Sequence, residues 1–305
     1  MNTRSAATQA MNIRIPTPRD FSFKRTVLSH GWYSLLPFAL DKETWTLTRV
    51  LDVGRSAPVT VRLSAAPDAI SVQVAGQASA RVHAHIVRAV RHALRLDDDM
   101  QTFYGAVKSD PAFAWIVQQG AGRLLRAPTV FEDLVKTICT TNCSWALTDK
   151  MVTELVNNLG RPARDGRRAF PDAATMAAAP VAFYRDVMRA GYRAPYFKEL
   201  AERVAGGELD PESWLTSELP TAELKRAMKQ VKGVGDYAAE NLLKLVGRYD
   251  VLALDSWVRS QYARLHNRGR AAADQKIARH YARFQTWRGL ALWCDMTKDW
   301  LEEKG

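Results

Sequence analysis

The chain has 305 residues, of which 47% are hydrophobic and 25% are charged, a composition that is ordinary for a globular protein with room for two modest domains. No run of eighteen apolar residues occurs, which argues against a membrane-spanning helix. The 43 lysines and arginines against 32 acids give a net charge of +11. This surplus favours a polyanionic partner, without separating DNA from RNA or an acidic membrane surface.

The first twenty residues form the first predicted segment. They are basic, contain no acid before Asp20 and show little apolar periodicity. We therefore expect a disordered basic arm over residues 1–20. An arginine-rich, acid-poor start also occurs in organelle transit peptides, but this one is short and has no convincing amphipathic face.

Strand-like patterns follow. Residues 45–53, 59–63 and 70–74 alternate in polarity or are β-branched, and turn residues separate them. The sequence therefore predicts a small antiparallel sheet. Upstream of these strands, residues 29–38 are rich in aromatic side chains and contain His30, for which we predict no functional role because a lone histidine beside a tryptophan is more often structural.

The rest of the chain is almost wholly helical. Residues 80–96 form an amphipathic helix that is basic on its exposed side, and the three aspartates at 97–99 are predicted to cap the next helix. No internal repeat is present. The predicted fold class is α+β, with an N-terminal α+β domain over residues 21–105 followed by a mostly helical domain over residues 106–305.

The most informative stretch is residues 224–265. It predicts a helix, a tight hairpin at Gly233-Val234-Gly235, a second helix, a short apolar run and a third helix. Glycine permits positive φ and lets a ligand approach the backbone closely. Because the hairpin precedes a helix N-terminus, its free N–H groups are suited to binding a phosphate. Two helices joined by a glycine turn would be the plainer interpretation of the hairpin alone.

Asp255 adds a chemical group to this stretch. It follows the apolar run VLAL and precedes SWVRSQYARL, so it is predicted at the N-cap of the third helix. A capping role is compatible with catalysis, because a carboxylate beside a helix N-terminus is held ionised and rigidly aimed.

These segments resemble the helix-hairpin-helix (HhH-GPD) DNA glycosylases, which include the alkylbase and 8-oxoguanine glycosylases. The matching residues are VKGVGDYAA and, about twenty residues later, VLALD. The resemblance extends from about residue 21 to the end and is strongest after Gly122. It implies the α+β and helical domain layout given above, a hairpin that contacts DNA phosphates, and Asp255 as the catalytic carboxylate.

Two further segments carry the resemblance. RLLRAPTVFEDLVKTICTTNCSW places Asn142 where the 8-oxoguanine branch has an asparagine that fills the gap left by the flipped base, although asparagine is also common at helix ends. In GYRAPY, Tyr192 and Arg193 take the positions of a wedge tyrosine and of an arginine that reaches the unpaired base. Leu147 stands where that branch has a second arginine, which puts opposite-base selectivity in doubt.

The resemblance also indicates the base pocket. Bifunctional relatives have a catalytic lysine two residues after the second hairpin glycine, where this chain has Tyr237. Neither Lys232 nor Lys244 replaces it in the motif, so we expect a monofunctional enzyme without AP-lyase activity. The residues expected to line the base pocket are Tyr237, Asn241, Trp293 and Asp295. For Trp293 and Asp295 the alternative is an amphipathic terminal helix with tryptophan in the core.

No cofactor is expected. The three cysteines of the chain cannot supply the four-cysteine iron–sulfur cluster of some relatives, and they argue against a disulfide framework and for a reducing compartment. The family's hairpin often holds a monovalent cation, Na⁺ or K⁺, through backbone carbonyls. Here those carbonyls would belong to Lys229, Val231 and Val234.

The sequence thus favours a monofunctional glycosylase of base excision repair that acts on double-stranded DNA containing a damaged base. An acidic Asp295 in the pocket would suit a cationic alkylated purine such as 3-methyladenine. The alternatives are an 8-oxoguanine-type or modified or mismatched-pyrimidine glycosylase, and a non-catalytic hairpin DNA-binding protein. We expect a monomer without a membrane partner, in the cytoplasm and at the nucleoid of a bacterium, or nuclear or organellar in a eukaryote.

Overall fold

The structure, a computed structural model, describes residues 11–76 and 78–304. Its sheet is antiparallel throughout, with the strand order β1-β5-β4-β3-β2. The strands are β1 (Met11–Pro16), β2 (Phe38–Asp41), β3 (Thr46–Leu51), β4 (Val59–Ala66) and β5 (Ala69–Val74). The three predicted strands are therefore confirmed as β3, β4 and β5, and β2 was missed.

Strand β1 corrects the prediction of a disordered arm. Residues 11–16 pair with β5, with Ile13 opposite Val72 and Ile15 opposite Ile70. Ile13 and Ile15 are buried in the core, whereas the residues between them face outward. This alternation is short and lies next to arginines, which is why it was overlooked. The rest of the predicted arm, residues 1–10, lies outside the described residues.

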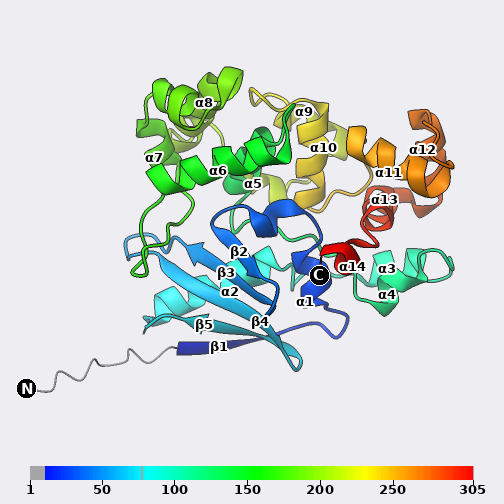
Figure 1. Cartoon of the computed structure of the whole chain (residues 1–305), viewed down its shortest axis with the longest axis horizontal. Coiled ribbons are helices and arrows are strands. Elements are labelled where there is room, and N and C mark those ends of the chain that lie inside the picture. The colour runs from blue at the N-terminus through cyan, green and yellow to red at the C-terminus, as the bar shows by residue number, and fades with distance from the viewer. Residues whose placement is uncertain (1–10, 77, 305) are drawn as a thin grey trace, which may run out of the picture.

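Helices make up most of the remaining chain (Figure 1). They are α1 (Phe23–Val27), α2 (Ala80–Ala93), α3 (Gln101–Val107), α4 (Ala114–Gln118), α5 (Val130–Cys139), α6 (Trp145–Leu159), α7 (Ala173–Ala178), α8 (Ala194–Ala205), α9 (Thr221–Met228), α10 (Asp236–Leu245), α11 (Ser256–His266), α12 (Asp274–Tyr281), α13 (Arg288–Met296) and α14 (Trp300–Lys304). Shorter 3-10 or π turns cover Gly31–Ser34, Phe183–Val187, Gly191–Arg193, Pro211–Leu215 and Ala282–Trp287. Across the two described ranges, we find no helix with the length and apolar character needed to cross a membrane.

Side-chain caps explain where several of these helices begin. In each case the oxygen of the N-cap side chain accepts a hydrogen bond from the backbone N–H three residues later, which satisfies a donor that the helix leaves free. The capping residues are Ser79 for α2, Thr129 for α5, Ser144 for α6, Asp172 for α7 and Asp255 for α11.

Two large hydrophobic cores lie within the described residues. The first joins the sheet and α2 to helices α5–α10. The second joins α3 and α4 to α11–α13, so the predicted domain boundary between residues 105 and 106 falls inside α3, a helix that packs with the C-terminal half. The end of the chain returns to α1, where Arg25 Nη1 donates to the Lys298 carbonyl at 2.7 Å (Figure 1).

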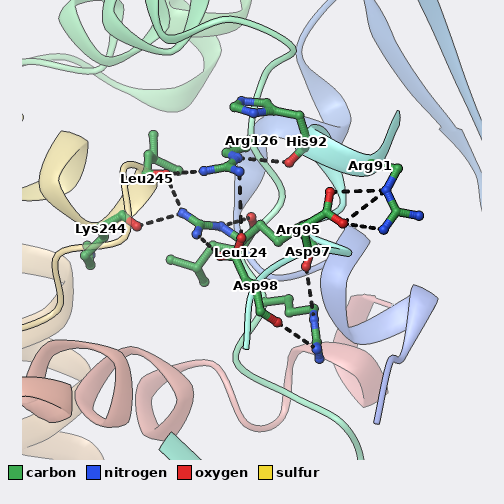
Figure 2. Close-up of polar contacts among 10 residues, drawn as sticks. Arg91, His92, Arg95, Asp97, Asp98, Leu124, Arg126, Lys244 and Leu245 are labelled. Atoms are coloured by element: carbon green, nitrogen blue, oxygen red, sulfur yellow. Dashed lines mark hydrogen bonds and ion pairs between the residues drawn. The ribbon is translucent and has the colours of Figure 1, made fainter. Parts of the chain in front are cut away.

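Of the aspartates at 97–99, which were predicted to cap α3, only Asp99 binds the start of that helix: its Oδ1 accepts from the N–H of Gln101, the first residue of α3, at 2.9 Å. The N-cap of α3 is Met100, without a side-chain cap. Asp97 pairs instead with Arg91 and Asp98 with Arg95, because the preceding helix presents basic side chains to them (Figure 2).

Arg95 links the two halves of the molecule. Its side chain is 1% exposed. Nε donates to the Leu124 carbonyl at 3.0 Å, and Nη2 donates to the Lys244 carbonyl at 2.9 Å and to the Leu245 carbonyl (Figure 2). Lys244 and Leu245 are the last residues of α10, whose C-terminal carbonyls have no partner within the helix. A side chain two residues beyond the end of α2 therefore binds the end of α10.

A second buried ionic group connects the sheet to α5. Arg49 of β3 donates from Nη1 to Glu132 Oε1 at 2.7 Å, and Lys136 Nζ lies 2.7 Å from the same oxygen. Burial alone would raise the pKa of Glu132, but Arg49 and Lys136 together hold it below its ordinary value. The carboxylate is therefore ionised and paired on both sides.

Candidate active site

The hairpin between α9 and α10 presents free backbone donors. Gly233 has φ +90°, a conformation that favours glycine, and a Cβ there would lie 3.1 Å from Tyr196 Cδ2. Val234 N–H donates to the Val231 carbonyl at 3.0 Å. Within the described residues, the N–H groups of Gly233 and Gly235 donate to no acceptor, and Gly235 is the N-cap of α10. This arrangement suits an anion.

The charges beside the hairpin are balanced locally. Asp236 is the first residue of α10, and its carboxylate Oδ1 lies 3.0 Å from both Lys229 Nζ and Lys225 Nζ. Hydrogen bonds from these lysines lower the pKa of Asp236. A carboxylate at this position would repel a phosphate, but Lys229 and Lys225, which also pairs with Glu240, offset its charge.

We expect Gly233→Ala to lower the free energy of unfolding by about 1–3 kcal/mol, because an L side chain is strained at positive φ and crowds Tyr196. The matched variant is Gly235→Ala, at φ −85°, where an added Cβ meets nothing within 4 Å. Gly235→Ala should lower the free energy of unfolding by less than about 1 kcal/mol. It should weaken DNA binding, because its methyl group lies where a phosphate would approach the free N–H groups. Urea unfolding and fluorescence anisotropy measure the two effects, and equal destabilisation by both variants would contradict this account.

Asp255 is the N-cap of α11, as predicted, and its Oδ1 accepts from Val258 N–H at 2.6 Å. Ala253, two residues earlier, is buried with φ +52°, an uncommon conformation for a residue with a Cβ. The backbone is thus turned sharply just before the carboxylate. Asp255 lines both a cavity and the surface groove that contains the hairpin.

The cavity has a volume of about 410 Å³, enough for a flipped base. Its wall is rich in tryptophan, which offers flat apolar faces. The tryptophans are Trp32, Trp145, Trp257, Trp293 and Trp300. The ionisable or polar side chains that share the wall include His30, Tyr237, Asn241, Lys244 and Asp255.

Three of the four residues predicted for the base pocket lie on this wall. Tyr237, Asn241 and Trp293 line the cavity, and Tyr237 also lines the groove. Asn241 Nδ2 donates to the Tyr237 carbonyl at 2.8 Å. Burial raises the pKa of Tyr237, so its phenol stays protonated.

Asp295 does not line the cavity, which corrects its predicted contact with the base. Its Oδ2 accepts from Tyr281 Oη at 2.6 Å and lies 2.8 Å from His266 Nε2. With His280, these side chains join α11, α12 and α13, and the ligand-type atoms of His266, His280 and Asp295 lie within 4.8 Å of one another. Asp295 faces inward on α13 while Trp293, two residues earlier, reaches the cavity, because neighbouring positions on a helix point in different directions.

The predicted wedge residues meet at the groove. Asn142 has φ +47°, and its Nδ2 donates to Tyr192 Oη at 3.2 Å. The Tyr192 side chain is 55% exposed, and its ring lies beside that of Tyr196. Both predicted positions therefore line the same groove as the hairpin.

Arg193 does not reach outward as predicted. It is 4% exposed, and its guanidinium donates to Thr141 Oγ1 at 3.0 Å and to the Thr141 carbonyl. It holds the loop that carries Asn142 rather than presenting a charge to a partner base. Free carbonyl oxygens in a short polar loop attract a nearby guanidinium. The sequence alone does not show that this loop lies beside Arg193.

Sequence reasoning missed two features of the cavity. The turn Gly31–Ser34 and His30 form one wall, and Trp32 Nε1 donates to Asp133 Oδ1 at 2.6 Å. Lys244, which the motif comparison set aside, is 3% exposed, and its Nζ lies 4.1 Å from the centre of the Trp293 ring. The unusual aromatic content of residues 29–38 was the available signal for the first; for Lys244 the signal was a cation on the buried face of α10.

The carbonyls predicted to hold a monovalent cation are compatible with that role. Among the described residues, those of Lys229 and Val234 accept no hydrogen bond, whereas that of Val231 accepts one from Val234 N–H. Carbonyl oxygens are suitable ligands for a hard cation.

Comparison with solved structures identifies the fold. The chain is similar to MBOgg1 in complex with a low-affinity DNA ligand (TM-score 0.73, 21% identity, 100% of this chain and 99% of that one). It is also similar to 3-methyladenine DNA glycosylase from Archaeoglobus fulgidus (0.72, 20%, 93% and 98%) and to the apo form of 8-oxoguanine glycosylase/lyase from Clostridium acetobutylicum (0.71, 18%, 92% and 94%). No protein-family model and no curated protein matches the chain. The fold is thus the one these DNA glycosylases share.

Proposed function

We propose that the protein is a DNA glycosylase that extrudes a damaged base from duplex DNA and hydrolyses its N-glycosidic bond. The observation that carries this proposal is the position of Asp255, whose carboxylate lies where the hairpin groove meets the tryptophan-lined cavity. DNA in the groove and a base in the cavity would place the sugar between them, next to this carboxylate.

Asp255 would act at the sugar. As the bond between C1′ and the base nitrogen breaks, the electron pair leaves with the base and positive charge develops at C1′. The carboxylate would stabilise that charge and take a proton from the attacking water, whose oxygen bonds to C1′. The released base gains a proton, and an abasic sugar remains.

We further propose that the enzyme is monofunctional. Tyr237 occupies the position of the lysine that would attack the sugar, and its phenol stays protonated because burial raises its pKa. No cofactor is needed for hydrolysis; a monovalent cation bound by the carbonyls of Lys229, Val231 and Val234 would rigidify the hairpin. The proposed partner is damaged double-stranded DNA bound by a monomer.

The structure changes the basis for assigning the substrate base. The expectation of an alkylated purine such as 3-methyladenine rested on the missing motif lysine and on an acidic Asp295 in the pocket. Asp295 lies outside the pocket, among the side chains of Tyr281 and His266, so only the first of these two grounds remains. Alkylated and oxidised purines therefore both belong in the test of function.

The test is release of a base from duplexes that each carry one lesion, followed by incubation with and without alkali. Strand breaks that appear only after alkali mean base removal without lyase activity. Tight, salt-dependent DNA binding without release of any base would contradict the proposal and favour a non-catalytic DNA-binding protein.

We expect Tyr192→Ala to slow release from a paired lesion by about 10- to 100-fold, because an aromatic ring stacked on a base contributes about 1–3 kcal/mol. The loss should be smaller when the lesion lies in a bulge or mismatch, since extrusion then costs less. Tyr192→Phe is the matched control, which keeps the ring and removes only the hydrogen bond from Asn142. Single-turnover rates compare them, and equal losses on paired and unpaired lesions would argue against a wedge.

A further inference from the structure

Lys244 lines the cavity but not the outer groove. Tyr237, Asn241 and Lys244 all line it from one face of α10, because residues three, four and seven apart share a helix face. Tyr237 also lines the outer groove, whereas Lys244 lines only the cavity. Seven residues correspond to about 10 Å along the helix axis. The side chain of Lys244 therefore faces the cavity proposed to hold the base, and Asp255 is the opposite charge that acts on it most.

The ammonium group has no polar partner of its own. It lies over the Trp293 ring at 4.1 Å, and within the described residues it makes no hydrogen bond or ion pair. Burial lowers the pKa of Lys244 to about 8, an effect that Asp255 and Glu240 partly oppose. Most of the population is still charged at neutral pH. A buried cation without an acceptor is costly unless a ligand supplies the acceptor.

The backbone around this lysine is held firmly. Arg95 donates to the carbonyls of Lys244 and Leu245, and Arg126 Nη1 donates to the Leu245 carbonyl at 3.4 Å (Figure 2). The backbone at Lys244 is thus fixed, and contact with the Trp293 ring restricts the position of the ammonium group. A side chain that recognises a ligand selectively has to be held in one position by its surroundings, as Lys244 is.

His30 lines the same cavity and supplies the complementary group. Its Nε2 contacts the Leu125 carbonyl, so Nε2 carries the proton and Nδ1 has a free lone pair. Burial lowers the pKa of His30 to about 3, with Lys244 among the cations that add to the effect. The imidazole is therefore a neutral acceptor at neutral pH, close enough to Lys244 to feel its charge.

On the basis of the proposed function, we propose that Lys244 and His30 read the carbonyl and adjacent N–H edge of an extruded keto purine. The lysine would donate to the carbonyl oxygen and the histidine would accept from the ring N–H, while the tryptophans stack on the faces. Hypoxanthine and 8-oxoguanine present this edge. Cationic 3-methyladenine lacks a carbonyl and would be repelled by the ammonium group.

The experiment compares single-turnover release of hypoxanthine and 8-oxoguanine from single-lesion duplexes with release of 3-methyladenine from methylated DNA. We expect wild type to favour a keto purine. Lys244→Met, which retains an apolar contact with Trp293, should reduce release of that base by about 10- to 100-fold without a matching loss for 3-methyladenine. His30→Phe should reduce it selectively as well.

Binding provides a readout that does not depend on catalysis. Duplexes with 2′-fluorinated deoxyinosine resist hydrolysis, and wild type should bind them more tightly than undamaged duplexes, whereas Lys244→Met should lose that preference. If the preference depends on Lys244 but no base is released, the proposed function fails and the recognition proposal stands. If bases are released and Lys244→Met slows all of them equally, the recognition proposal fails alone. Covalent trapping of Lys244 on DNA by borohydride would also overturn it, since the amine would then reach the sugar.

Discussion

Asp255→Asn is expected to lower the rate of base release by at least about 10³-fold, because the variant loses both the negative charge beside C1′ and the group that deprotonates water. The fold should survive. Asparagine is as good an N-cap as aspartate, so the hydrogen bond from Val258 N–H can be kept. DNA affinity should stay within about threefold of wild type, since the hairpin donors are untouched.

The control for this variant is Asp172→Asn. Asp172 caps α7 through a hydrogen bond from Thr175 N–H at 2.7 Å, in the same way that Asp255 caps α11, and it does not line the active-site cavity. Single-turnover rates and thermal unfolding of both variants separate chemistry from capping. Release at the wild-type rate by Asp255→Asn would rule out the proposed mechanism.

Arg95→Met is expected to lower the free energy of unfolding by about 3–5 kcal/mol, the largest effect on stability that we predict. The variant leaves the carbonyls of Lys244 and Leu124 without the guanidinium, and Asp98 loses its nearest cation. The hydrogen bonds to the two carbonyls are buried, so water replaces them poorly, whereas the side chain of Asp98 is 28% exposed and loses less.

Arg91→Met is the matched control, one helical turn away on α2. Its ion pair with Asp97 has side chains that are 33% and 63% exposed, and such pairs contribute less than about 1 kcal/mol. Urea denaturation gives both values. A loss below about 1 kcal/mol for Arg95→Met would show that the guanidinium does not stabilise the junction between α2 and α10.

The elements that the sequence predicted well have local causes. The hairpin follows from two glycines between periodic apolar segments, and Asp255 was placed at an N-cap because an apolar run stops directly before it. Strands β3, β4 and β5 show alternation over enough residues to be recognised. These signals depend on neighbours in sequence, so they need no knowledge of the fold.

The misplaced side chains depend on distant neighbours. Asp295 and Trp293 are two residues apart, yet only Trp293 reaches the cavity, because Tyr281 and His266 bind the carboxylate from other helices. Arg193 turns inward to the Thr141 backbone, which is 52 residues away. The direction in which a polar side chain points depends on its tertiary partners, and these partners cannot be identified from a single sequence.

The cavity is a composite of both halves of the chain. Residues 30–34 come from the segment between β1 and β2, while most of the other lining residues come from later helices, α5, α6, α10, α11, α13 and α14, and from the loops beside them. Exchanging the N-terminal half between two proteins of this architecture would therefore transfer part of their base selectivity along with it. A truncated protein that keeps only the helices after α3 would retain Asp255 and the hairpin but lose one side of the chamber in which a lesion is inspected.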